Sequence, residues 1–195
     1  QVLGKRDNSR YESARKAYTQ ALTLYRRVGS SDGEADVLDG IGRVNYALGK
    51  YFEARQSFVD ALAIYRSLQS RSGEASCLHG LGNVDLSQGH AEASRQNQNS
   101  ALAIYRQIND RLGEAGALSS IGAAEQAMGH GAEARQAYGS ARDLYHSLKA
   151  PWGEADALMS LGTLLSTSDP KTAKTHLQEA ATLFDSIGMS DKAAA

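Results

Sequence analysis

The sequence predicts an all-α solenoid built from helix–turn–helix repeats. The tripeptide Gly-Glu-Ala occurs four times at intervals of 40 residues, beginning at Gly33, Gly73, Gly113 and Gly153. A strict period of this length indicates one supersecondary unit stacked on copies of itself. The chain contains only two prolines and is rich in helix-favouring residues. No segment shows the alternation with a period of two that a strand would require.

The composition restricts the classes of function. A chain of 195 residues with 42% hydrophobic and 22% charged residues is long enough to bury a sizeable core. Its net charge of −1 provides no basic field for nucleic acid or anionic lipid, so neither partner is expected. No apolar run approaches the roughly 20 residues that span a bilayer. No charged-then-apolar leader opens the chain, so we expect a secretory signal to be absent or already removed. The single cysteine, Cys77, fits a reducing compartment, and we expect a cytoplasmic protein.

Each repeat carries signals for the ends of two helices. In residues 30–69, the first helix is predicted to end before Gly49 and the second to cover about residues 51–68. The apolar side chains of that second helix share one face, as the 3.6-residue period requires. Residues that suit helix ends recur at matching positions: the N-cap candidates Ser30, Ser70 and Asp110, the first-turn Pro151, and the left-handed glycines Gly49, Gly89 and Gly129.

Glycine also recurs in the middle of the first helix, at Gly42, Gly82, Gly122 and Gly162. A glycine inside a helix costs about 1 kcal/mol relative to alanine. Its presence at one position in all four repeats therefore predicts close approach of the partner helix. A column of tyrosines follows the same period and is predicted to form core or inter-repeat contacts: Tyr25, Tyr65, Tyr105 and Tyr145.

These patterns resemble the tetratricopeptide repeat. The resemblance rests on Leu-x-x-Leu-Gly in the first helix, as at Leu78, Leu81 and Gly82, and on Ala-x-x-x-Phe-x-x-Ala in the second, as at Ala54, Phe58 and Ala61. The usual repeat has 34 residues, so this form is longer by about a turn and a half of helix. It is similar to repeats of the mitotic-spindle adaptor family and, equally, to arrays that follow ATPase modules in bacterial and fungal signalling proteins. The resemblance implies a right-handed superhelix that binds proteins.

We expect one array made of a leading second helix and four full repeats. The predicted boundaries are a partial repeat at 1–29 and full repeats at 30–69, 70–109, 110–149 and 150–188. Residues 189–195 are interpreted as the start of a further repeat or a cloning remnant. The chain would then be a fragment of a longer array, and its exposed ends would favour self-association. Lys5–Ser9 is predicted to be a polar insertion in a turn, because Leu3 and Gly4 look like the end of a preceding helix.

Three motifs that could carry chemistry have better structural explanations, so no catalytic, cofactor or metal site is expected. Gly29-Ser30-Ser31-Asp32-Gly33 matches a nucleophile elbow, but that motif requires a strand before the serine. Gly40 and Gly42 lie in mid-helix, whereas a phosphate loop places its glycines at a helix N-terminus. His90 and His130 occupy equivalent turns about 10 Å apart, too far for a shared zinc ion with bonds of about 2 Å.

Arginines also form columns with the same period. One contains Arg15, Arg55, Arg95 and Arg135, and the other contains Arg26, Arg66 and Arg106. A basic stripe of this kind can bind phosphate backbones. However, 22 acidic residues accompany 21 basic ones, so we expect these arginines to be solvated and ion-paired.

The predicted binding site is a concave groove. In proteins that this chain resembles, the first helices line such a groove and ligands dock on the residues that do not pack. Transferred by position, these are Asp36, Asp39, Arg43, Tyr46, Ser76, His79, Asn83, Leu86, Ser119, Gln126, Asp156, Met159 and Thr163. These positions vary between repeats while the packing positions recur, as expected for a common scaffold with a varied surface.

The resulting hypothesis is a protein–protein interaction scaffold, not an enzyme, whose groove holds an extended or helical peptide. Asn83 suits a peptide backbone amide and Arg43 suits a carboxylate. Two alternatives remain. The groove residues can be merely solvated polar groups. The array can also be the sensor or regulatory arm of a larger signalling ATPase or transcription regulator, packing on its own chain.

Overall fold

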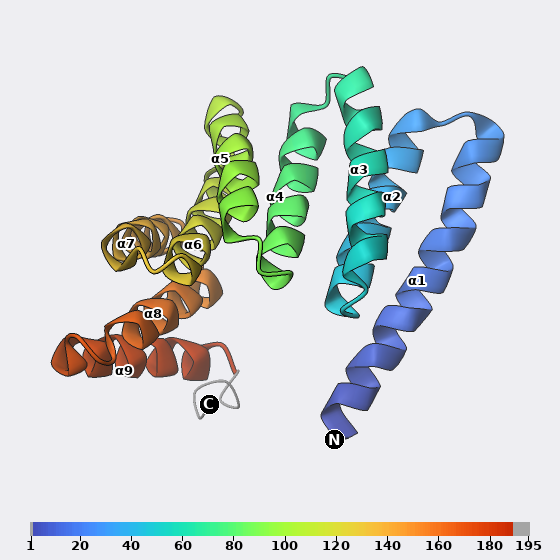
Figure 1. Cartoon of the computed structure of the whole chain (residues 1–195). Coiled ribbons are helices and arrows are strands. Elements are labelled where there is room, and N and C mark those ends of the chain that lie inside the picture. The colour runs from blue at the N-terminus through green and yellow to red at the C-terminus, as the bar shows by residue number, and fades with distance from the viewer. Residues whose placement is uncertain (1, 189–195) are drawn as a thin grey trace. The chain divides into compact units, whose positions relative to one another are not determined.

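The computed structural model describes the backbone of residues 2–188 and the side chains of residues 8–188. These residues form α-helices joined by short turns and contain no strand (Figure 1). The predicted all-α solenoid class is confirmed. The chain divides into two compact units, unit 1 (residues 1–104) and unit 2 (residues 105–195). The predicted start of a further repeat, residues 189–195, lies outside the described residues.

Unit 1 is a succession of packed helices. α1 packs against α2, α2 against α3 and α3 against α4, and α2 also touches α4 directly. The first helices of two consecutive repeats, α2 and α4, are therefore neighbours. The helices are α1 (Val2–Val28), α2 (Ser31–Ala47), α3 (Tyr51–Ser67), α4 (Arg71–Ser87) and α5 (Ala91–Gln107), whose last residues belong to unit 2.

Unit 2 repeats the same arrangement. α6 packs against α7, α7 against α8 and α8 against α9, and α6 touches α8. Ala134, Tyr138 and Leu161 form a buried cluster between α7 and α8, and Leu158 and Phe184 belong to a second cluster between α8 and α9. The helices are α6 (Arg111–Ala127), α7 (Gly131–Ser147), α8 (Pro151–Leu165) and α9 (Pro170–Ser186).

Most of the predicted N-caps are confirmed. Ser30 Oγ accepts a hydrogen bond from Gly33 N at 3.4 Å, and Asp110 Oδ1 accepts one from Gly113 N at 2.8 Å. Pro151 begins α8, where its missing N–H leaves no donor unpaired. Ser70 is the N-cap residue of α4, as predicted, but its side chain makes no capping hydrogen bond.

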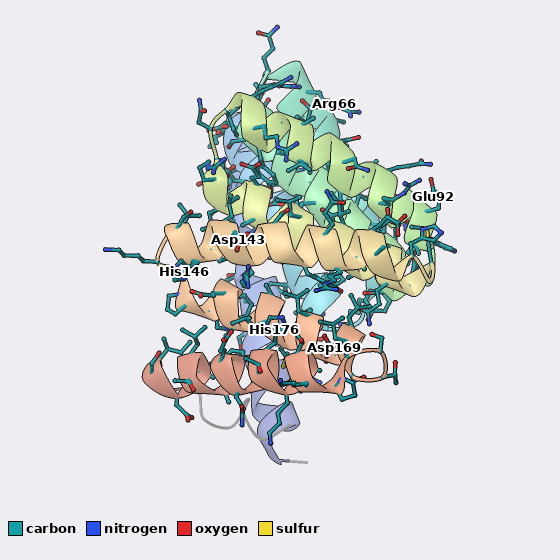
Figure 2. The ribbon with its side chains drawn as sticks, turned by 90° about the vertical axis from the view of Figure 1, so that its left-hand side faces the viewer. Arg66, Glu92, Asp143, His146, Asp169 and His176 are labelled. Carbon is teal, nitrogen blue, oxygen red and sulfur yellow. The ribbon has the colours of Figure 1, made fainter. Side chains whose placement is uncertain are left out.

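Asp169 caps α9 from the N-terminal end of that helix (Figure 2). Its Oδ1 accepts a hydrogen bond from Thr172 N at 3.2 Å. Hydrogen bonds from the side chain and backbone of Thr172 hold the pKa of Asp169 below its usual value. The predicted left-handed glycines that end the first helices are confirmed, with φ of 71°, 81° and 82° at Gly49, Gly89 and Gly129.

The N-terminal helix differs from the prediction. α1 is continuous from Val2 to Val28, whereas the sequence suggested a turn with an insertion at Lys5–Ser9. The segment contains neither proline nor glycine, so no residue within it interrupts the helical hydrogen bonds. The analogy between Gly4 and the turn glycine Gly49 was misleading.

The mid-helix glycines receive a side chain from the partner helix, as predicted. A Cβ atom at any of the four positions would lie within 3 Å of that side chain. The residue pairs are Gly42 with Phe58, Gly82 with Gln98, Gly122 with Tyr138 and Gly162 with Leu177. The missing Cβ of glycine therefore allows the two helices of each repeat to approach closely at the middle of the first helix.

The predicted inter-repeat role of the tyrosine column is also confirmed. Each tyrosine ring near the end of one repeat lies against the glycine of the next Gly-Glu-Ala tripeptide, where a Cβ atom would overlap the ring. The pairs are Tyr25 with Gly33, Tyr65 with Gly73, Tyr105 with Gly113 and Tyr145 with Gly153.

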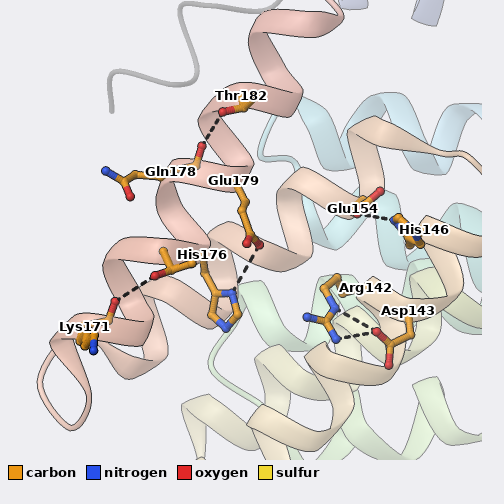
Figure 3. Close-up of polar contacts among 10 residues, drawn as sticks. Arg142, Asp143, His146, Glu154, Lys171, His176, Gln178, Glu179 and Thr182 are labelled. Carbon is orange, nitrogen blue, oxygen red and sulfur yellow. Dashed lines mark hydrogen bonds and ion pairs between the residues drawn. The ribbon is translucent and has the colours of Figure 1, made fainter.

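The other two residues of the tripeptide also have structural roles. Its alanine is fully buried in all four repeats. Its glutamate pairs with a basic side chain eight residues earlier, in the last turn of the preceding helix. The contacts are Arg26–Glu34 at 2.8 Å, Arg66–Glu74 at 3.0 Å, Arg106–Glu114 at 2.8 Å and, in Figure 3, His146–Glu154 at 2.8 Å. The prediction that Arg26, Arg66 and Arg106 are ion-paired is confirmed.

A methyl group at Gly153 tests the tyrosine–glycine contact. We expect Gly153→Ala to lower the free energy of unfolding by about 1–3 kcal/mol, because the Tyr145 ring must move. Gly139→Ala is the matched control, since a Cβ at Gly139 in α7 meets no atom within 4 Å. The control should stabilise the protein by about 0.5–1 kcal/mol through helix propensity. Urea unfolding followed by circular dichroism measures both, and equal effects of the two substitutions would contradict the steric explanation.

Candidate functional site

The predicted site residues of unit 1 lie on α2 and α4, which are neighbours. Their spacing of three or four residues places them on one side of each helix. We call this set the first-helix face of unit 1: Asp36, Asp39, Arg43 and Tyr46 on α2, and Ser76, His79, Asn83 and Leu86 on α4. The remaining predicted residues lie on α6 and α8 in unit 2.

Arg43 is exposed but firmly held. Its Nε and Nη2 atoms lie 2.9 Å and 2.8 Å from Asp39 Oδ2. Its Nη2 also donates to Ser76 Oγ on α4 at 2.6 Å, and Ser76 in turn donates to the Asp39 carboxylate at 3.3 Å. The Arg43 side chain remains 65% exposed, whereas that of Asp39 is only 12% exposed. The predicted site residue Asp39 thus lies beneath the surface and anchors the guanidinium.

Cys77 lies beneath the same cluster and was not predicted to be part of it. Its Sγ lies 3.9 Å from Asp39 Oδ1, and the residue is fully buried. Burial raises the pKa of the Cys77 thiol, and the Asp39 charge raises it further. The thiol is therefore neutral and unreactive at neutral pH.

Asp36 and Tyr46 link α2 to neighbouring helices. Tyr65 of α3 donates a hydrogen bond to Asp36 Oδ1 at 2.7 Å. Burial raises the pKa of Tyr65, and the hydrogen bond to Asp36 raises it further. Tyr46 Oη lies 3.1 Å from Ser87 Oγ on α4, and its ring packs at a tilt against Tyr51. Both side chains thus have defined positions.

His79 and Asn83 are half-buried on α4 and meet Gln98 of α5. The Gln98 Nε2 atom donates to the main-chain oxygen of His79 at 3.1 Å and to Asn83 Oδ1 at 2.9 Å. Burial lowers the pKa of His79, so its imidazole is neutral at neutral pH. Gln98 was not among the predicted site residues, although it occupies the position of Phe58 and Tyr138 in the adjacent repeats.

The predicted residues of unit 2 mostly contact their own or an adjacent helix. Tyr138 donates a hydrogen bond to Gln126 Oε1 at 3.0 Å, and Thr163 donates to the main-chain oxygen of Met159 at 2.9 Å. Met159 packs against the buried cluster of α8 and α9. Burial raises the pKa of Tyr145, and the Ser119 side chain opposes this rise.

Asp156 is half-buried on α8 and acts on Tyr138 through its charge. Burial, assisted by this negative charge, raises the pKa of Tyr138 to about 12. The phenol of Tyr138 is therefore neutral at neutral pH and remains a hydrogen-bond donor.

The neutral state of His79 predicts a pH dependence of stability. The unfolded chain binds more protons than the folded one between the ordinary histidine pKa of about 6.5 and the lowered pKa of His79. The free energy of unfolding should therefore decrease as the pH falls through this window. Urea unfolding at several pH values should show a shallower decrease for His79→Gln. A His79 proton resonance that titrates at the ordinary value would contradict this prediction.

No three His, Cys, Asp or Glu side chains at positions 8–188 gather in a way that could hold a metal ion. Within residues 2–188, each helix falls short of the length and apolar character that a bilayer span requires.

Solved structures share this fold at low sequence identity. A Rap protein complexed with competence and sporulation factor is 17% identical with a TM-score of 0.83, over 94% of this chain and 51% of that chain. BtubC from P. vanneervenii is 13% identical with a TM-score of 0.73, over 94% and 87%. PlcR of Bacillus thuringiensis, in complex with the peptide PapR7 and DNA, is 11% identical with a TM-score of 0.70, over 96% and 71%.

The chain spans about half the length of the Rap protein. A comparison with curated proteins finds no match. The sequence pattern of the tetratricopeptide repeat matches residues 4–67 and 41–107. Together these matches cover residues 4–107, more than half of the 195 residues. The chain therefore belongs to the tetratricopeptide repeat family, whose fold is a scaffold for protein interactions.

Proposed function

We propose that this protein binds a peptide segment of a partner on its first helices and has no catalytic role. Family membership supports the general function, because stacked helical repeats offer an extended binding surface. Two proteins of similar fold support a peptide ligand: the Rap protein is complexed with competence and sporulation factor, and PlcR with the peptide PapR7. We place the contact on the first-helix face of unit 1. A contribution of the unit 2 residues to binding stays a prediction: Ser119, Gln126, Asp156, Met159 and Thr163.

The arrangement of Arg43 carries this proposal. Its guanidinium is tied to Asp39 and Ser76, yet its side chain is 65% exposed. A side chain already fixed in the free protein loses little conformational freedom when a ligand binds. A guanidinium also forms strong, directional hydrogen bonds with carboxylate and carbonyl oxygens. Arg43 is therefore suited to contact an acceptor group of a peptide.

The rest of the first-helix face complements Arg43. Tyr46 and Leu86 are partly exposed and offer apolar contact area, which supplies affinity when a peptide docks. Asn83 offers an amide that can pair with peptide groups. This combination of apolar contacts and a few fixed polar groups is typical of peptide-binding surfaces.

Paired substitutions on the first-helix face test the proposal. The probe is a peptide selected from a random phage-displayed library by binding to the unaltered protein. We expect Arg43→Ala combined with Asn83→Ala to weaken its binding about tenfold or more, because a hydrogen bond to a charged group contributes about 1.5–3 kcal/mol. Isothermal titration calorimetry measures the affinity, and circular dichroism checks that the variant is folded.

The matched control carries the same residue changes on second helices. Arg27 and Asn99 are exposed on α1 and α5, so Arg27→Ala combined with Asn99→Ala should leave peptide binding unchanged. Equal affinity of both folded variants for the peptide would place the binding site elsewhere and refute the assignment to the first helices.

A further inference from the structure

The helix α1, at the end of unit 1 (Figure 1), exposes aromatic residues that the next second helix buries. Tyr18 and Tyr25 are 37% and 39% exposed, whereas Phe58 and Tyr65, which occupy the same positions on α3, are 2% and 5% exposed. Of the large hydrophobic side chains that are exposed in the described part of the chain, five of twelve belong to α1. Such a concentration of exposed apolar residues indicates an interaction surface.

The uncovered residues follow one face of α1. Positions 10, 14, 17, 21, 24 and 28 are separated alternately by four and three residues, which places them on one side of a helix. We call this set the α1 stripe: Arg10, Ala14, Ala17, Ala21, Leu24 and Val28. Leu24 and Val28 are 52% and 69% exposed, and Arg10 is also exposed. By the same helical spacing, Tyr18 and Tyr25 lie along the edge of the stripe.

The contacts of α3 show what kind of element fits such a face. α3 packs between two first helices, α2 and α4. The Phe58 ring lies against Gly42 of α2 and against Gly80 of α4. The Tyr18 ring lies against Gly40 of α2, which corresponds to Gly80 one repeat later. In the described structure, Tyr18 thus has the glycine contact of one first helix where Phe58 has two. A helix with a small residue at the level of Tyr18 would supply the second.

Two observations indicate that the fitting helix is acidic. Residues 8–28 of α1 contain five basic residues and one acidic residue, whereas each of the four first helices contains more acidic than basic residues. In addition, Tyr65 of α3 donates a hydrogen bond to Asp36 of α2 at 2.7 Å. The hydroxyl of Tyr25, at the same position on α1, has no such partner among the described residues. A carboxylate on the docked helix would accept this hydrogen bond.

We propose that the α1 stripe docks an acidic amphipathic α-helix of a partner protein, with a glycine or alanine against Tyr18 and a carboxylate at the Tyr25 hydroxyl. Apolar contacts at three- and four-residue spacing are the usual basis of helix docking. A second copy of this chain fits poorly, because two α1 helices would bring basic residues together and because α2 and α8 already pack on a second helix at each side. The α1 stripe shares no residue with the first-helix face, so this inference does not depend on the function proposed above.

A helical peptide with the sequence of α2, residues 31–47, is the probe. It carries four acidic residues, one basic residue and Gly42. A side-chain lactam bridge away from Asp36 and Gly42 keeps it helical, since a free peptide of this length is only marginally so. Fluorescence anisotropy should show that the labelled peptide binds the unaltered protein. The affinity should decrease as the salt concentration rises, and a peptide with Gly42→Leu should not bind.

Leu24→Glu tests the place of binding, because it removes apolar area from the α1 stripe and adds a negative charge. We expect the affinity for the α2 peptide to fall about tenfold or more. Thr23→Glu is the matched control, since it adds the same charge at an exposed position outside the stripe; it should change the affinity less than about twofold. Both variants should keep their circular dichroism spectrum and their affinity for the phage-selected peptide.

A double-mutant cycle tests the carboxylate. Tyr25→Phe keeps the ring that lies against Gly33 and removes only the hydroxyl. It should weaken binding of the α2 peptide about tenfold, as expected for a hydrogen bond to a charged group. With a peptide that carries Asp36→Ala, the same substitution should have little further effect. Equal effects of Tyr25→Phe on both peptides would refute the predicted contact with a carboxylate.

Three results would overturn the docking surface itself. They are no binding of the helical α2 peptide, binding that Leu24→Glu leaves unchanged, and a dimer of the unaltered protein in analytical ultracentrifugation that Leu24→Glu dissociates. The last result would assign the α1 stripe to a second copy of this chain. None of them affects the proposal for the first-helix face, which the variants of Arg43 and Asn83 test separately.

Discussion

The contact between a tyrosine ring and the glycine of the following Gly-Glu-Ala tripeptide determines how each repeat joins the next. The ring occupies the space that a Cβ atom would need, so no other L-residue fits there without displacing it. The adjacent alanine is fully buried, and the glutamate pairs with a basic side chain of the preceding helix. One short motif thus provides close approach, apolar burial and a charge contact, and it recurs every 40 residues.

The difference between residues that pack and residues that do not explains why the surface of the first helices varies from repeat to repeat. Residues that contact the partner helix or the next repeat are constrained to recur, because each junction requires the same shapes. Residues between them are free to differ, and on α2 and α4 they form a face with an anchored guanidinium, an oriented amide and partly exposed apolar side chains. The variation is not confined to the surface. At position 98 it extends into the contact between α4 and α5, where a glutamine replaces an aromatic ring and donates a hydrogen bond to Asn83.

The elements of the fold were predictable to the extent that they repeat. The helix ends at Gly49, Gly89 and Gly129 and the packing of Gly42 against Phe58 follow from residues that occur in several repeats. The error concerns a feature that occurs once: the sequence suggested a turn at Lys5–Ser9 by analogy with a later repeat, whereas α1 continues through it. Among the recurring features, Ser70 is the N-cap residue of α4, as Ser30 is of α2, but its side chain makes no capping hydrogen bond.

The helical class, the repeat length and the packing positions follow from the sequence alone, because periodic glycines and tyrosines mark contacts that every repeat must make. The sequence also identified Arg43 and Asn83 as residues outside that packing set. How these side chains are held depends on the tertiary fold: Asp39 lies beneath Arg43, Ser76 contacts Arg43 from the adjacent helix, and Gln98 donates a hydrogen bond to Asn83. The Ser76–Arg43 contact joins residues 33 positions apart and the Gln98–Asn83 contact joins residues 15 positions apart, in each case on separate helices. They depend on the exact approach of two helices, which a pattern along one chain does not contain.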